Sequence, residues 1–186
     1  MSAAADEPLL PEPQPAAEAW ERQIEDLYEA FHPAVLRKAT LASAGCTADA
    51  WDATQHAFIK AWEHMHDLQL NEVVNWKGWL IKTAVRHVLF ARRHDTRHIP
   101  LDDTEPADDR ILLEDHVVLK ETYQGMLEAV GQLSERQRQA LVLVHIAGCS
   151  TAEAAADMAV SVSTVRNLIH QARARLLAAN GEENDD

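Results

Sequence analysis

Apolar residues recur three and four positions apart through most of the chain, which is the spacing of an amphipathic helix. In the first half this spacing predicts three helices, which begin at Trp20, at Thr47 and near Asn75, the last running to about residue 93. Their predicted inward faces carry Ile24, Leu27, Phe31 and Val35, then Trp51, Thr54, Phe58, Trp62 and Met65, then Leu80, Ala84, Val88 and Ala91. Pro33 is expected to bend or break the first helix, because proline cannot donate the helical hydrogen bond.

The helical pattern stops between about residues 95 and 120. Two prolines and many acidic residues predict a solvated linker there, with one helical turn near residues 111–113. The expected organisation is therefore all-α, with two small helical bundles joined by a flexible acidic linker. The predicted boundaries are a disordered tail over 1–19, a first domain over 20–95, a linker over 96–120, a second domain over 121–179 and an acidic tail over 180–186.

Three residues mark helix ends in the second domain. Ser134 is followed three positions later by Gln137, and Ser150 three positions later by Glu153. Both pairs match the capping box, in which each side chain binds the other residue's free backbone N–H at a helix start. Gly148 stands where a helix end needs a left-handed backbone. These signals predict two helix starts and one helix stop.

A further helix is expected to start at Ser161, after a short break. Its predicted inward face is Val165, Leu168, Ile169, Ala172 and Leu176. Its predicted outward face is Ser163, Thr164, Arg166, Asn167, His170, Gln171 and Arg173. A helix, a tight turn and a second helix with polar and basic residues near its start form a helix-turn-helix that can read the major groove of DNA. An ordinary packing helix with a solvated face is the alternative that spacing alone leaves open.

The net charge of −13 is unusual for a protein that binds nucleic acid. However, residues 1–19, 101–115 and 180–186 carry net charges of −4, −6 and −4, so the rest of the chain is nearly neutral. Residues 160–179 contain three arginines and no acidic residue, and residues 82–98 carry a net charge of +4. The acidity therefore lies in the tails and the linker, and the candidate DNA-binding segments are locally basic.

Several classes of protein are not favoured. The chain has no apolar run of membrane-spanning length and no secretory signal, and Cys46 and Cys149 lack metal-ligand spacing, so a cytoplasmic protein with two buried core cysteines is expected. Ten histidines suggest a metalloprotein, but only His94 and His98 have helical i, i+4 spacing. No nucleophile motif or phosphate loop is present, which predicts a non-enzymatic protein without metal or cofactor.

The C-terminal half resembles region 4 of the extracytoplasmic-function sigma factors, a branch of the sigma-70 family. Four blocks carry the resemblance, in the same order as in the family: 133–141 (LSERQRQAL), 150–155 (STAEAA), 163–167 (STVRN) and 172–176 (ARARL). The resemblance implies that the outward face of the last helix reads the −35 promoter element and that this domain contacts the flap of the polymerase β subunit. Ala159 departs from the family, which usually has glycine in this turn.

The N-terminal half is similar to sigma region 2. Residues 52–62 match the family pattern D-x-x-Q-x-x-F-x-x-x-W, with Asp52, Gln55 and Ile59 on one predicted exposed face. The resemblance implies that these three residues bind the clamp helices of the polymerase β′ subunit. A solvated aspartate and glutamine would be the interpretation if this block stood alone.

The next helix is similar to the segment that recognises and melts the −10 element. The resemblance and the basic charge assign this role to Trp76, Lys82, Arg86, Phe90, Arg92 and Arg93. Cationic groups can follow the phosphates of a separated strand, and aromatic rings can stack on its bases. For Trp76 and Phe90, however, packing in the core is a stronger expectation than stacking on bases, because aromatic side chains are ordinarily buried.

The whole chain thus predicts a sigma factor that directs core RNA polymerase to promoters. Two alternatives remain at this stage: a sigma mimic that sequesters an anti-sigma factor, and a stand-alone helix-turn-helix regulator. The expected partners are core RNA polymerase, promoter DNA and an anti-sigma factor.

Overall fold

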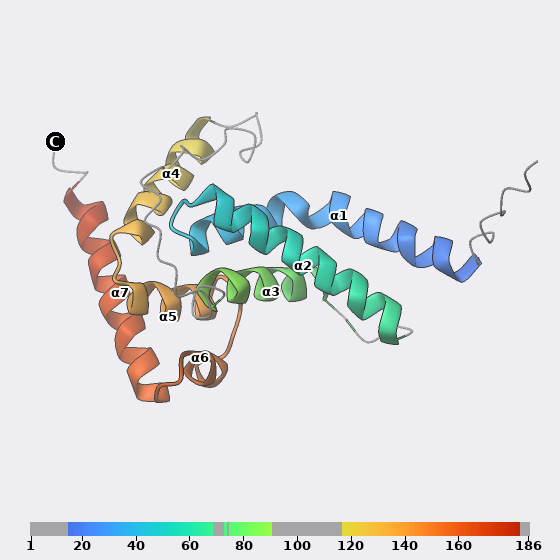
Figure 1. Ribbon diagram of the computed structural model, residues 1–186. Helices are drawn as coiled ribbons and strands as arrows, with labels where there is room; N and C mark the ends of the chain where they lie inside the picture. The colour runs from blue at the N-terminus through green and yellow to red at the C-terminus, as the bar shows by residue number, and fades with distance from the viewer. Residues whose placement is uncertain (1–14, 69–72, 74, 91–116, 183–186) are drawn as a thin grey trace, which may run out of the picture.

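The computed structural model describes residues 15–68, 73, 75–90 and 117–182, and every regular element in these ranges is an α-helix (Figure 1). In chain order they are α1 (Pro15–Ala42), α2 (Thr47–Leu68), α3 (Trp76–Phe90), α4 (Val117–Gly131), α5 (Glu135–His145), α6 (Thr151–Met158) and α7 (Val162–Glu182). The predicted all-α class is confirmed. None of these helices is long and apolar enough to cross a membrane.

The helix bounds differ from the expected ones at three places. Helix α1 begins at Pro15, inside the segment expected to be a disordered tail, and α4 begins at Val117, inside the expected linker. Proline suits the first helical position and alanine-rich sequence follows it, so α1 extends beyond its apolar stripe. Helix α7 runs to Glu182, inside the segment expected to be an acidic tail. Helix α3 is described as far as Phe90, and its expected end near residue 93 lies outside the described residues. The proposed turn at residues 111–113 lies outside the described residues.

Helices α1, α2 and α3 pack on one another as the first bundle, on the right of Figure 1. Their shared core contains Val35 and Ala39 from α1, Phe58 from α2, and Leu80 and Ala84 from α3. Asn75 begins α3 by accepting a hydrogen bond from the backbone N–H of Gly78 at 2.9 Å, as an N-cap residue does. The predicted position of this helix start is confirmed.

Pro33 does not break α1, which continues to Ala42. A proline inside a helix removes one hydrogen bond and costs about 3 kcal/mol. Ile24 before it and Val35 and Leu36 after it nevertheless pack against the same core. Burial on both sides of Pro33 therefore keeps the chain helical through the proline.

The prediction that Trp51 and Trp62 face the core is wrong. Both are partly exposed, at 36% and 41% of their accessible surface. The buried face of α2 consists instead mainly of alanines, Ala50, Ala53, Ala57 and Ala61, together with Thr54, Phe58 and Met65. Small side chains let neighbouring helices approach closely, and the two bulky indoles lie beside this contact rather than within it.

The second bundle contains the helix-turn-helix, α6 followed by α7, supported by α5. Both predicted capping boxes are confirmed, at Ser134 with Gln137 and at Ser150 with Glu153. Gly148 has the predicted left-handed backbone, with φ of 69°, and the following N–H, that of Cys149, donates to the Leu143 carbonyl at 2.9 Å. The core contains Leu143 from α5, Met158 from α6 and Val165 from α7.

The two bundles pack against each other, which the sequence left open. Buried residues of both form one continuous apolar cluster, and α5 lies between α3 and α7 (Figure 1). Helix α4 adds a second contact, because Tyr123 donates a hydrogen bond to the carbonyl oxygen of Arg37 on α1 at 2.9 Å. Burial raises the pKa of the Tyr123 phenol.

Candidate nucleic-acid and polymerase interfaces

The outward face of α7 is as predicted. Exposed side chains are Ser163, Thr164, Arg166, Asn167, His170, Gln171 and Arg173. Val165, Ile169 and Ala172 alternate with them and are buried, which fixes the rotation of the helix. Ser161 caps α7, because its hydroxyl accepts from the backbone N–H of Thr164 at 3.1 Å. The arrangement presents short polar groups and arginines along one side of a helix.

Two residues of this face are held by α5. The Arg173 guanidinium lies 3.0 Å from Nε2 of His145, and the Gln171 amide oxygen accepts from the side chain of Gln137 at 3.2 Å. Partial burial, and then the charge of Arg173, lower the pKa of His145. A neutral imidazole can accept a hydrogen bond from the guanidinium and so orient it. Neither partner was anticipated from the sequence.

Asp52, Gln55 and Ile59 form one exposed face of α2, and Ile59 is 54% exposed. Asp52 is also 2.7 Å from Nε2 of His87 on α3, and the His87 ring stacks on His56 at a centroid distance of 4.1 Å. Burial, followed by the neighbouring His87, lowers the pKa of His56. The role of His87 was missed, because no local spacing links residue 87 to residue 52.

The residues of α3 assigned to the −10 element divide into two sets. Lys82 and Arg86 are partly exposed and lie one helical turn apart on the side facing α6. Trp76 and Phe90 are half-buried and pack against the main core, and Trp76 contacts Trp79 edge-to-face with ring centroids 5.7 Å apart. Arg92 and Arg93 lie outside the described residues.

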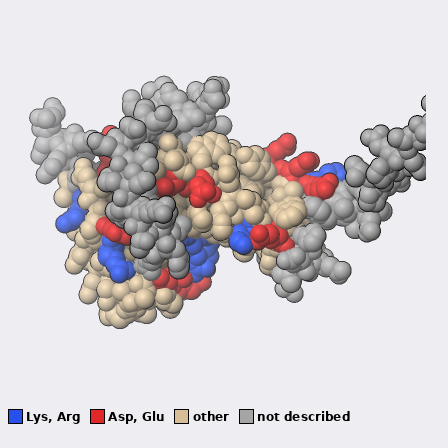
Figure 2. Space-filling view, viewed as in Figure 1, with Lys and Arg blue, Asp and Glu red and all other residues tan. Residues whose placement is uncertain are grey.

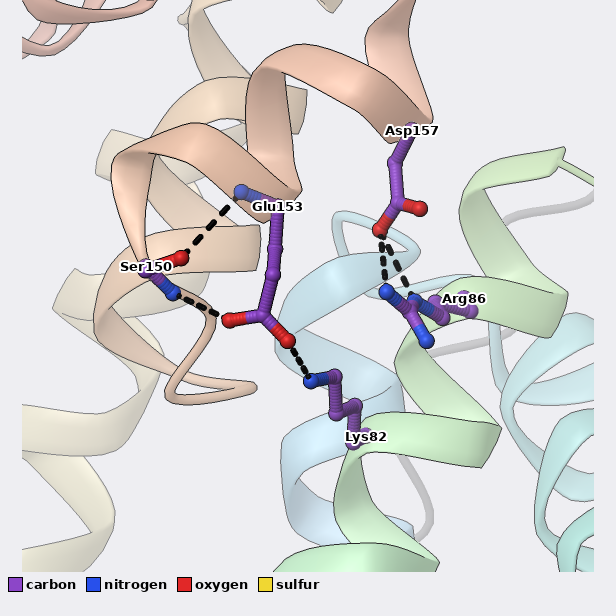
Figure 3. Close-up of polar contacts among 5 residues, drawn as sticks. All are labelled: Lys82, Arg86, Ser150, Glu153 and Asp157. Carbon is purple, nitrogen blue, oxygen red and sulfur yellow. Dashed lines mark hydrogen bonds and ion pairs between the residues drawn. The ribbon is translucent and has the colours of Figure 1, made fainter.

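Lys82 and Arg86 form ion pairs with the helix-turn-helix (Figure 3). The Lys82 ammonium lies 2.5 Å from Glu153, and the Arg86 guanidinium lies 2.8 Å from Asp157. The hydrogen bond from Lys82, and then those within the capping box, lower the pKa of the Glu153 carboxyl from 4.5 to about 2. The i, i+4 spacing of the two basic residues on α3, and that of the two acidic residues on α6, is visible in the sequence, but the apposition of the two helices is not.

Basic and acidic side chains are mixed on the face of the molecule seen in Figure 2. Within the described ranges, no group of three or more histidine, cysteine or acidic side chains is placed to hold a metal ion.

Comparison with known proteins identifies both bundles. Residues 27–98 match the family described as Sigma-70 region 2, and residues 123–176 match Sigma-70, region 4. The ECF RNA polymerase sigma factor SigM of Mycobacterium tuberculosis is 30% identical over 155 residues, which are 82% of this chain and 74% of SigM. SigL of the same organism is 26% identical over 156 residues, covering 76% of this chain and 80% of SigL.

Solved structures share the fold. One is CnrH in complex with the cytosolic domain of CnrY, with a TM-score of 0.51, 24% identity and coverage of 91% of this chain and 94% of that one. Another is the sigma factor RpoE of Bartonella quintana in complex with the anti-sigma factor NepR, with a TM-score of 0.51, 21% identity and coverage of 91% and 99%. The two regional matches, the order of the helices and the relationship to SigM together establish that this chain belongs to the extracytoplasmic-function family of RNA polymerase sigma factors.

Proposed function

We propose that this chain binds core RNA polymerase through the exposed face of α2 and directs it to promoters by reading the −10 element with α3 and the −35 element with α7. Family membership implies promoter-specific initiation and no catalysis by the chain itself. The main observation that supports this assignment is on α7, where every residue of the outward polar face is exposed while Val165, Ile169 and Ala172 on the opposite side are buried. Under this proposal the protein acts in the cytoplasm, where polymerase and promoters are found.

The roles of individual residues follow from their chemistry. Arg166 and Asn167, near the start of α7, can make paired hydrogen bonds with base edges, and Ser163 and Thr164 can donate to phosphates. On α2, Ile59 offers an apolar anchor beside the polar groups of Asp52 and Gln55. Each DNA contact alone is weak. Both gain affinity when polymerase holds them on one promoter, because the second contact is then intramolecular.

Run-off transcription with purified core polymerase tests the proposal. The templates are a library with randomised −10 and −35 segments, transcribed with and without the chain. We expect specific new transcripts that are lost in Asp52→Ala, whereas Lys60→Ala on the same helix retains them. Transcripts absent with the unaltered chain, despite measurable binding to core polymerase, would contradict promoter-directed initiation.

The same assay tests the −35 surface. Replacing a base-reading arginine should cost about 1–3 kcal/mol of promoter binding and relax sequence preference at one position. We expect this for Arg166→Ala. Arg175→Ala removes the same charge from the exposed side of α7 outside the proposed surface and is the matched control. Equal losses in both variants would contradict the assignment of base reading to Arg166.

We also propose an anti-sigma factor as a partner. Two of the solved structures of similar fold are complexes, one of CnrH with the cytosolic domain of CnrY and one of RpoE with the anti-sigma factor NepR. A pull-down with the genomically neighbouring proteins, followed by transcription in their presence, tests this partner. Inhibition that addition of more of this chain reverses is the expected result, and the absence of any binding partner would contradict it.

A further inference from the structure

The face of α2 that carries Asp52 is tied to α3 by a side chain that the proposed function does not use. Nε2 of His87, in the last turn of α3, lies 2.7 Å from Oδ2 of Asp52. A carboxylate oxygen accepts a hydrogen bond, so the imidazole donates it from Nε2, which it can do whether the ring is neutral or charged. The contact therefore defines which atom of His87 carries a proton and where that proton points.

We infer that His87 is a positioning residue for the polymerase surface, which holds the Asp52 carboxylate in one orientation before the polymerase binds. The inference rests on the proposed function, because it takes Asp52 as a residue that contacts core polymerase. It goes beyond that function by giving a role in polymerase binding to a residue of α3, 35 positions away in the chain.

The hydrogen bond leaves Asp52 available to a partner. The Asp52 side chain is 73% exposed, whereas the His87 side chain is 22% exposed. A carboxylate has two oxygens and about four lone-pair sites, so one bond to His87 leaves most of its capacity to accept hydrogen bonds unused. These exposures are those of a carboxylate that is supported from the protein side and open to solvent on the other.

His87 is itself held in place by His56 of α2. The two imidazole rings stack with centroids 4.1 Å apart and an angle of 28° between their planes. Burial, and then His87, lowers the pKa of His56, so its ring is neutral near pH 7 and stacks without a second positive charge. Lys60 and Glu63, two further charged groups of α2 near His56, pair with each other at 2.7 Å. Each side chain from His56 through His87 to Asp52 thus restrains the next.

The backbone beneath these side chains is fixed by close packing of the two helices. Ala53 and Ala57 on α2 and Ala84 on α3 are completely buried in the core of the first bundle. Such small residues let the helices approach closely, and a packed core deforms little. The separation of residues 52 and 87 is therefore set by the core and does not depend on the hydrogen bond between them.

A held carboxylate binds more tightly than a mobile one. The side chain of an exposed aspartate without such a bond exchanges among staggered χ1 rotamers, and it loses that freedom when a partner fixes it. The hydrogen bond from His87 removes this freedom on folding instead. The expected gain in affinity is about twofold to fivefold, in the lower part of the range for immobilising a side chain because aspartate is short.

The free protein tests the positioning directly. Vicinal couplings between the α and β protons of Asp52, measured by NMR on the full chain, report whether χ1 holds one rotamer or averages over several. We expect one rotamer in the unaltered chain and in His87→Gln, because the glutamine amide can donate from a nitrogen placed much as Nε2 of histidine is. His87→Ala should show averaged couplings. A single rotamer in His87→Ala would overturn the inference, as would averaging in the unaltered chain.

Binding to purified core polymerase tests the consequence. Anisotropy titrations compare fluorescently labelled unaltered chain with His87→Ala, His87→Gln, Asp52→Ala and the double variant His87→Ala/Asp52→Ala. We expect His87→Ala to bind about twofold to fivefold more weakly and His87→Gln to bind as the unaltered chain does. The double variant should bind no more weakly than Asp52→Ala, because His87 acts only through Asp52. Additive losses would mean that His87 acts by another route and would refute its role as a positioning residue.

Thr83→Ala is the matched control, because it removes a partly exposed polar side chain one helical turn before His87 on α3. It should bind core polymerase as the unaltered chain does, and a loss equal to that of His87→Ala would refute the specific role of His87. Undiminished binding by Asp52→Ala would contradict the proposed polymerase surface itself. Weakened binding by Asp52→Ala beside undiminished binding by His87→Ala would instead overturn only the inference about His87.

Discussion

At the scale of the residue, the turn of the helix-turn-helix places an alanine in a backbone conformation that favours glycine. Ala159 ends α6 in the left-handed conformation, with φ of 53° and ψ of 47°. A residue with a Cβ atom is strained there, whereas glycine is not. The family resemblance had already marked this position as one where glycine is usual, and the structure explains why.

Ala159→Gly should therefore stabilise the protein by about 1 kcal/mol, because relief of the left-handed strain outweighs the additional conformational entropy that glycine gives the unfolded chain. Ala156→Gly, at an exposed position inside α6, should destabilise the protein by about the same amount, because glycine is unfavourable in a helix interior. Urea unfolding of both variants measures the two values. A loss of stability in Ala159→Gly would contradict the strain argument.

At the scale of the element, α2 shows that neighbouring apolar residues can have unrelated roles. Phe58 is 7% exposed within the core, and Ile59 is 54% exposed on the proposed polymerase surface. One residue corresponds to a rotation of 100° around a helix, which is enough to turn the side chain from the core to solvent. The energetic consequences of truncating the two residues should differ accordingly.

Phe58→Ala should cost about 3–5 kcal/mol of unfolding free energy, because it leaves a cavity in the core. Ile59→Ala should cost less than about 1 kcal/mol and should instead weaken binding to core polymerase, where an exposed aliphatic side chain can act as an anchor. Chemical denaturation and a polymerase binding assay on the two variants separate these effects. Similar destabilisation by both changes would contradict the assigned rotation of α2.

At the scale of the whole molecule, the ion pairs between the bundles make the stability of the folded protein depend on pH. The pKa of Glu153 is lowered from 4.5 to about 2 in the folded protein, chiefly by the hydrogen bond from Lys82. A carboxyl group whose pKa is lowered on folding contributes stability that is complete above its unfolded pKa. That contribution is lost as pH falls through the interval between the two values.

The unfolding temperature of Glu153→Gln should therefore lie below that of the unaltered protein at pH 6, and the difference should shrink as pH falls from 4.5 toward about 2. Glutamine resembles the protonated carboxyl group, so the two proteins become alike in acid. Glu128→Gln serves as the control for the change in net charge. Calorimetry across this pH range gives the difference, and a constant difference would contradict the linkage.

Much of the local structure was determined by the sequence alone. The capping boxes at Ser134 and Ser150, the left-handed Gly148 and the exposed face of α7 depend on residues within a few positions of one another, so spacing is sufficient to predict them. The family resemblance rests on the same local patterns. It anticipated both regions that the comparisons identify.

Only the tertiary structure decided which surfaces meet. The sequence shows that Lys82 and Arg86, and separately Glu153 and Asp157, have helical spacing, but not that α3 and α6 face each other across 71 positions of chain. The continuous helix through Pro33 and the outward placement of Trp62 likewise depend on how α1, α2 and α3 pack. Local spacing fixes which side of each helix is apolar, whereas the pairing of helices depends on the shape and charge of surfaces assembled from distant segments.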